Sequence, residues 1–326
     1  MKKIFIIALF ISMLVSCQKA ENKQSTQAIV IETSPVFVAD SAYQYVKNQV
    51  DFGPRVPNTK AHDECSAYLV AELKRFGAET IEQRADLIAF DGTILKSVNI
   101  IGSYNPKAAS RVLLFAHWDS RPWSDHDPIP ENRTKPVLGA NDGASGVGVL
   151  LEMARHFNIQ KPEIGVDIIF FDAEDYGAPE SFQGKSEDSW CLGSQYWSKN
   201  PHIKGYTAKF GILLDMVGAP DATFYKEEIS MYYAGHVVNK VWSVAEQSGF
   251  GQYFRDENIG GITDDHLYVN KIIGIPSIDI IHYNKDSNQG FGHYWHTVYD
   301  NMENIDKNTL FAVGSTLMKV VYSESL

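Results

Sequence analysis

Two adjacent carboxylates, Glu174 and Asp175, follow an apolar run and could carry metal and proton chemistry. The run, residues 165–171, is rich in isoleucine, valine and phenylalanine and is typical of a buried strand. Burying two neighbouring carboxylates at the end of such a strand costs free energy unless a cation lies beside them or one of them is protonated. The pair therefore suits one metal ligand beside one proton carrier. The alternative for these two residues alone is a solvated acidic turn.

Polar side chains follow the other strand-like runs in the same way. They are His117 and Asp119 after the run 111–116, Asp215 after 209–214, Asp142 at the start of a helix running to about residue 157, and His296 in the loop after 277–281. In open α/β sheets the ligand site lies beyond the carboxyl ends of the strands, so we expect these groups to converge. Carboxylates and imidazole together suit Zn²⁺. Taken singly, Asp142 reads as a helix cap and His117 as a buried structural histidine.

Length and composition favour one large α/β domain with a sizeable core, since 44% of the 326 residues are hydrophobic. The expected strands are 79–90, 95–104, 111–116, 165–171, 209–214 and 277–281, and helices are expected after residue 40, after Thr59, after Gly143, after Gly235 and over 306–322. The formal charge of -11 argues against nucleic acid as a partner. The glycine-rich stretch 139–146 lacks a Walker lysine and a dinucleotide fingerprint, which argues against a nucleotide.

The amino terminus has the features of an export signal. Lys2 and Lys3 precede an apolar run, residues 4–15, that is shorter than the ~20 residues of a spanning helix. The run ends in Leu-Val-Ser-Cys at residues 14–17, which resembles the lipobox of bacterial lipoproteins. We therefore expect a signal peptide over 1–17 with Cys17 lipidated, a polar tether over 18–39 and a catalytic domain over 40–326. This predicts an exported, periplasm-facing lipoprotein that touches a membrane only through its anchor, and leaves open which membrane.

The ordered motifs resemble those of the co-catalytic zinc aminopeptidase superfamily. They are His117-Trp118-Asp119, Asn141-Asp142-Gly143, Glu174-Asp175, Asp215-Met216-Val217-Gly218 and Trp295-His296-Thr297. Within that superfamily the chain looks most like the glutaminyl cyclases of animal type, which also occur in bacteria, because of the segment 262–266, of Trp295 directly before His296, and of the sequence 188–194. The resemblance covers about residue 40 to the end. It implies a zinc aminopeptidase-like fold, with a central twisted mixed β-sheet flanked by helices on both faces.

The resemblance also implies an activity, the conversion of an N-terminal glutamine of peptides or exported proteins to pyroglutamate with release of ammonia. It implies one Zn²⁺ per chain on Asp142, Asp175 and His296, Glu174 as general acid/base, Asp215 linked to Asp264, and a substrate pocket walled by Trp118, Trp190, Ile262, Phe291 and Trp295. Two positions depart from the animal enzymes, which usually have Glu where Asp175 stands and His where Asp279 stands. The role of Asp279 is open.

Two other functions must be weighed against a cyclase. The first is a zinc aminopeptidase, which binds a second metal through residues matching His117, Asp142 and Asp215. The second is a lipid-anchored protein that binds a peptide without turning it over, although such a protein has no need of Glu174. The sequence also leaves open whether Cys65 and Cys191 form a disulfide bond.

Overall fold

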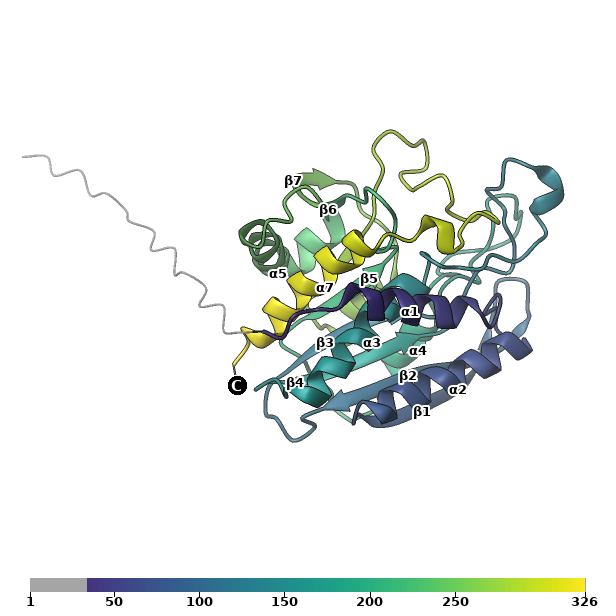
Figure 1. Ribbon diagram of the computed structural model, residues 1–326. Coiled ribbons are helices and arrows are strands. Elements are labelled where there is room, and N and C mark those ends of the chain that lie inside the picture. The colour runs from purple at the N-terminus through teal and green to yellow at the C-terminus, as the bar shows by residue number, and fades with distance from the viewer. Residues whose placement is uncertain (1–33, 326) are drawn as a thin grey trace, which may run out of the picture. The chain divides into compact units, whose positions relative to one another are not determined.

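A six-stranded mixed sheet forms the centre of the molecule (Figure 1). This computed structural model describes residues 34–325, so the expected signal peptide, Cys17 and the tether up to residue 33 lie outside it. The sheet order is β1-β2-β4-β3-β5-β8. The strands are β1 (Glu79–Ile88), β2 (Ile94–Tyr104), β3 (Arg111–His117), β4 (Gly165–Phe171), β5 (Gly211–Asp215) and β8 (Ser277–Ile281). The expected mixed α/β architecture is confirmed.

Strand direction decides where the site can form. Strands β3, β4, β5 and β8 pair in parallel, whereas β1 and β2 pair with their neighbours in antiparallel fashion. The carboxyl ends of the four parallel strands therefore share one edge of the sheet. His117 ends β3 and Asp215 ends β5, and the acidic pair follows β4 after two residues. This is the edge where α/β sheets bind ligands.

Helices cover both faces of the sheet (Figure 1). One layer holds α1 (Ala39–Val50), α2 (Lys60–Arg75), α3 (Ala144–Ile159), α5 (Glu228–Gln247) and α7 (Lys307–Tyr322), and the other holds α4 (Leu192–Lys199), α6 (Asp265–Tyr268) and a π-helical turn, Val269–Ile273. Two 3-10 turns, Pro130–Asn132 and Met302–Asn304, and a small parallel pair, β6 (Phe224–Glu227) with β7 (Phe254–Ile259), complete the fold. Every residue of β4, β5 and β8 is buried, which explains why their sequences are mostly apolar.

The start of helix α5 differs from the expectation that it follows Gly235. The helix begins at Glu228, because the carboxylate of Glu227 accepts the backbone N–H groups of Ile229 and Ser230 as an N-terminal cap. Ala234, with φ of -142°, interrupts the helix just before Gly235. The glycine thus marks an internal break. The expected cap of α2 is confirmed, since Thr59 accepts the backbone N–H of His62.

The last residues of the expected tether pack against the domain. Phe37 is buried, and its ring lies where a side chain on Gly314 of α7 would stand. The backbone N–H of Val38 donates to the carboxylate of Glu152. Between residues 34 and 325 no helix combines the length and the apolar character needed to cross a membrane. Cys65 and Cys191 are both buried and form no disulfide bond.

Replacing Gly146 by Ala should strongly destabilise the fold. Helix α3 approaches β5 so closely at this position that an added Cβ would lie 2.2 Å from the backbone oxygen of Leu214. Overpacking of this kind lowers the free energy of unfolding by about 1–3 kcal/mol, and here the backbone of α3 or β5 must move. Gly235→Ala is the matched control, because its Cβ would meet only the flexible end of Met231 at 3.6 Å. Thermal unfolding should show a lower Tm for Gly146→Ala alone, and equal Tm values would contradict this account.

Candidate active site

A pocket of about 420 Å³ opens at the carboxyl ends of the parallel strands. Its acidic and imidazole lining is Asp142, Glu174, Asp215, Asp264 and His296, and its apolar lining includes Trp190, Met216, Ile262, Ile281, Phe291 and Trp295. The acids that the sequence places at separate strand ends therefore converge. Acidic groups facing an aromatic wall are typical of a site that orients a small polar substrate.

Three residues at this end of the sheet could hold one metal ion. Asp142, Asp175 and His296 are buried, and one potential ligand atom of each lies within 4.8 Å of the other two. Nε2 of His296 is 3.3 Å from Oδ1 of Asp175 and 3.7 Å from Oδ2 of Asp142. Within residues 34–325, Oδ2 of Asp175 is buried without a hydrogen-bond partner. An unpaired carboxylate oxygen among oxygen and nitrogen donors fits Zn²⁺, which takes such ligands at ~2.0–2.2 Å and leaves a fourth position open in catalytic sites.

Asp142 is held in place by a residue that sequence reasoning missed. Asp300 lies in the loop before α7, and its carboxylate accepts the backbone N–H groups of Asn141 (2.8 Å) and Asp142 (3.0 Å). Gly143 follows with φ of +91°, and a Cβ there would lie 2.8 Å from the ring of His117. Only glycine tolerates both the conformation and the contact. A buried Asp in an irregular loop gives no local sequence signal of this role.

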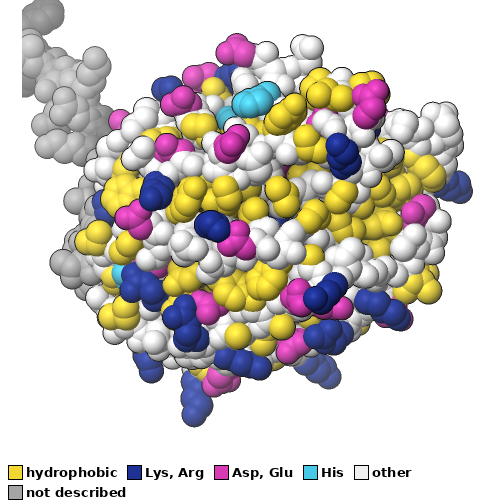
Figure 2. Space-filling model, turned by 45° about the vertical axis from the view of Figure 1, so that its right-hand side comes forward, with side chains coloured by type: hydrophobic (Ala, Val, Ile, Leu, Met, Phe, Trp, Pro, Cys, Tyr) yellow, Lys and Arg dark blue, Asp and Glu magenta, His cyan; other side chains and the backbone are white. Residues whose placement is uncertain are grey.

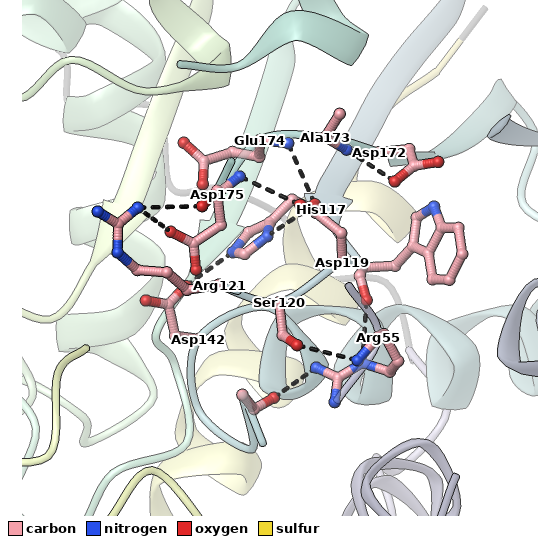
Figure 3. A network of polar contacts seen from close by, with 12 residues as sticks. Arg55, His117, Asp119, Ser120, Arg121, Asp142, Asp172, Ala173, Glu174 and Asp175 are labelled. Atoms are coloured by element: carbon pink, nitrogen blue, oxygen red, sulfur yellow. Dashed lines mark hydrogen bonds and ion pairs between the residues drawn. The ribbon is translucent and has the colours of Figure 1, made fainter. Parts of the chain in front are cut away.

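Asp119 fixes the acidic turn (Figure 3). Its carboxylate accepts the backbone N–H of Glu174 at 3.1 Å and that of Asp175 at 3.2 Å. The residue before the pair, Ala173, has φ of +52°, which L-residues rarely adopt. The motif His117-Trp118-Asp119 therefore contributes a positioning carboxylate.

Glu174 has the environment of a proton carrier. Burial raises the pKa of its carboxyl well above the usual value, with His117 opposing this effect and Asp264 adding to it. The thiol of Cys191 donates to Oε1 of Glu174 over 3.2 Å, and it is the only hydrogen-bond donor to this carboxylate within the described chain. Oxygen atoms of Glu174 and Asp264 and the sulfur of Cys191 lie within 4.8 Å of one another. A carboxyl so placed can pass a proton between groups in the pocket.

His117 bridges two of the acids. Its Nε2 lies 2.9 Å from Oδ1 of Asp142 and 3.2 Å from Oδ1 of Asp215, and these three residues form a second group that could hold a metal. Burial disfavours the charged ring, but hydrogen bonds to Asp119, Asp142 and Asp215 outweigh it and raise the pKa of His117 well above the usual value. A protonated His117 can thus lie between the carboxylates of Asp142 and Asp215 in place of a metal ion.

Asp264 lies in the loop that walls the pocket next to Asp215. Burial, and then the charge of Asp215, raises the pKa of the Asp264 carboxyl well above its usual value. Such a pair is expected to share a proton. Asp279 lies apart from the pocket lining: it is 1% exposed, and neither carboxylate oxygen has a hydrogen-bond partner within residues 34–325.

The aromatic wall agrees with the sequence interpretation except at one position. Trp190, Ile262, Phe291 and Trp295 line the pocket, and the indole of Trp295 stacks on His296 with ring centroids 3.8 Å apart. Trp118 does not line it and is corrected to a core residue. Its side chain is fully buried, donates to the backbone oxygen of Val98 and stacks on His62. Adjacent residues of an extended chain face opposite sides, so His117 and Trp118 cannot both face the site.

Comparison with known proteins places the chain in a family. The model for "Peptidase family M28" matches residues 99–321, which include every polar residue of the pocket. The chain belongs to peptidase family M28. The segment before residue 99, which includes α1, α2 and β1, lies outside that match.

Relatives of this M28 protein include cyclases and an exopeptidase. It is 57% identical to a glutaminyl cyclase of Bacteroides thetaiotaomicron bound to N-acetylhistamine, with a TM-score of 0.88 over 90% of this chain and 100% of the other. It is 58% identical to a Zn-dependent exopeptidase of Parabacteroides distasonis, with a TM-score of 0.89 over the same shares. The glutaminyl-peptide cyclotransferase of Bos taurus is 27% identical over 253 residues, which are 68% of this chain and 65% of the bovine protein.

Proposed function

We propose that this M28 protein is a zinc-dependent glutaminyl-peptide cyclotransferase, which converts an N-terminal glutamine of peptides or proteins to pyroglutamate and ammonia. The observation that carries this proposal is the carboxyl of Asp264 within 4.8 Å of that of Glu174. The carboxyl of Asp264 is thus a second group in the pocket that can carry a proton, beside the proposed general acid/base Glu174. Similarity to the cyclases of Bacteroides thetaiotaomicron and Bos taurus supports the same activity.

We assign one zinc ion per chain to Asp142, Asp175 and His296. Zinc bound there would act as a Lewis acid toward the γ-carbonyl of the substrate. The buried position of all three ligands fits this role, since electrostatic effects are strong where water is excluded. Asp119 and Asp300 hold the backbone of Asp175 and Asp142 so that the two carboxylates lie within reach of one metal ion.

Glu174 moves the proton that the reaction must transfer. The α-amine of the substrate attacks its own γ-carboxamide carbon, and Glu174 accepts a proton from that amine. Glu174 then gives the proton to the amide nitrogen, the carbon–nitrogen bond breaks, and ammonia leaves. A raised carboxyl pKa suits both halves of this transfer at neutral pH.

Asp264 and Asp215 would hold the leaving nitrogen, because a proton-sharing pair offers both a donor and an acceptor. Trp295, Trp190, Phe291 and Ile262 form the apolar wall around it. We propose that this wall excludes water and bends the glutamine side chain back toward its own amine. A near-attack geometry of this kind can supply several kcal/mol of the rate enhancement.

A zinc aminopeptidase is the alternative, favoured by the second cluster of His117, Asp142 and Asp215. A second metal there would replace the imidazolium link between the two acids. Product analysis distinguishes the two reactions directly: a cyclase releases ammonia from a peptide that begins with glutamine, and an aminopeptidase releases a free amino acid.

We further propose that the protein is exported and anchored to a membrane through lipid on Cys17, with its catalytic domain facing the periplasm. The apolar run 4–15 and the lipobox-like ending support this. Cys17→Ser should release the protein from the membrane fraction, and unchanged fractionation would contradict the anchor.

We propose no nucleic-acid partner, in line with the charge of -11. On the face in Figure 2, acidic side chains lie among the lysines and arginines.

Replacing Cys191 by Ala should lower kcat about fivefold with KM little changed. The substitution removes the thiol that donates to Glu174, a contribution of about 1 kcal/mol by analogy with other hydrogen bonds. Cys191→Ser keeps a donor at the same place and should restore most of the rate. Steady-state kinetics of both variants provide the test. Equal losses in the Ala and Ser variants would show that the volume of the sulfur matters and that its hydrogen bond does not.

A further inference from the structure

We propose that Arg121 and Asp125 form an outer shell around the metal site that positions two of its three ligands and sets the affinity for zinc. The pair lies in the long loop after β3, and neither residue lines the substrate pocket. The inference rests on the proposed zinc site and is independent of which reaction the site performs.

Arg121 connects a metal ligand to a second carboxylate. Its side chain is 1% exposed, and Nε and Nη2 donate to the two oxygens of Asp125, both over 2.7 Å. Nη1 donates to the backbone oxygen (3.0 Å) and to Oδ1 (3.3 Å) of Asp175, and to the backbone oxygen of Gly177. Figure 3 shows the guanidinium beside Asp175. Oδ1 of Asp175 is thereby held, and Oδ2 is left free for a metal.

Asp125 faces His296, the second metal ligand that this outer shell contacts. His296 presents Nε2 to the carboxylates of Asp142 and Asp175, while its Nδ1 is buried without a hydrogen-bond partner in the described structure. Oδ1 of Asp125 lies 3.6 Å from that nitrogen. A histidine that binds metal through Nε2 carries its proton on Nδ1, and that N–H requires an acceptor. A movement of a few tenths of an ångström by Asp125 would complete this hydrogen bond.

This arrangement needs the planar guanidinium group of an arginine. Five N–H groups in one plane let Arg121 bind both oxygens of Asp125 and still reach Asp175. The guanidinium also lies over the ring of Trp190, 4.6 Å from its centroid. A lysine would offer one positive nitrogen and could not span the same acceptors. The outer shell thus links the metal ligands to one wall of the substrate pocket.

A different use of the same residues is a second cation. Asp125, His126 and His296 also form a group whose potential ligand atoms lie within 4.8 Å. That use is disfavoured, because His296 would have to bind metal through both ring nitrogens and lose both protons. Both oxygens of Asp125 are moreover already bound by Arg121.

The test is the zinc affinity of the full-length protein, measured by competition with a chelator after metal removal. Asp125→Asn and Arg121→Lys should each weaken zinc binding by about 10–100-fold, the usual effect of losing an outer-shell partner. The matched controls are Glu131→Gln and Arg133→Lys, exposed residues of the same loop, which should leave affinity unchanged. Excess zinc should restore the turnover of Asp125→Asn.

The Asp125 variant keeps the test decisive even if Arg121→Lys folds poorly. Asn has the shape of Asp and its amide oxygen can still accept one N–H of Arg121, so the metal-free variant should fold, although it should unfold at a lower temperature than the metal-free parent because the buried guanidinium loses its charged partner. Wild-type zinc affinity in Asp125→Asn would overturn the proposal. So would an additional zinc in the parent protein that only Asp125→Asn loses, since this would identify a second cation site. Because binding is measured without turnover, failure of the cyclase assignment would not affect this result.

Discussion

Turnover of an N-terminal glutamine substrate should fall by about 10²–10⁴-fold in the Glu174→Gln variant, the range for loss of a general acid/base. Gln has the shape of Glu and can still accept the thiol hydrogen of Cys191, but it cannot take up a proton from the substrate amine. The acidic turn should remain in place, because Asp119 binds backbone N–H groups that the substitution leaves intact. The loss should therefore appear in kcat.

Two measurements separate a chemical effect of Glu174→Gln from a structural one. Zinc content should equal that of the parent protein, since Asp142, Asp175 and His296 are unchanged. Glu187→Gln, at an exposed position of the following loop, should retain full activity as the matched control. A Glu174→Gln variant with normal kcat would remove this residue from the mechanism.

Removal of zinc should abolish turnover, and addition of one equivalent per chain should restore it. One oxygen of Asp175 has no hydrogen-bond partner among residues 34–325, and neighbouring acids are buried beside it; both observations favour a bound cation, because several acids cannot stay charged together in a protein interior. Metal-free protein should also unfold at a lower temperature, since zinc binds only the folded chain with high affinity.

The stoichiometry of reactivation bears on the alternative function. Full activity with one zinc per chain supports the assignment to Asp142, Asp175 and His296. A requirement for two would place the second ion at His117 and Asp215 and favour the aminopeptidase. Substitution of Asp175 by Asn should mimic metal removal, while Asp188→Asn, in the loop before α4, should not. Full activity in verified metal-free protein would contradict a zinc mechanism altogether.

Much of this site could be predicted from the sequence because strand ends are visible in it. Apolar runs fixed the positions of β3, β4 and β5, and parallel strands bring the residues after them to one edge. The sequence alone therefore predicts that His117, Glu174 and Asp215 lie together. The same reasoning failed at Trp118, where alternation along the strand turns the side chain into the core.

Residues of irregular loops that support the site from behind could not be predicted. Asp300 and Arg121 contact two of the proposed metal ligands from segments that have no periodicity, so these contacts follow from tertiary structure alone. The sequence predicts that helix α5 starts after Gly235, whereas the helix begins at Glu228 with the carboxylate of Glu227 as its cap. Local propensity was overridden there by a buried hydrogen-bond network, in which Glu227 also accepts the backbone N–H of Ile262.

The most direct test of the proposed function is ammonia release from a short peptide that begins with Gln, measured beside a matched peptide that begins with Leu. The full-length zinc-bound protein should release one ammonia per Gln peptide, with a product lighter by the mass of ammonia. Neither peptide should yield a free amino acid. Free leucine without ammonia would contradict the cyclase, identify a zinc aminopeptidase, and leave Asp264 a structural residue.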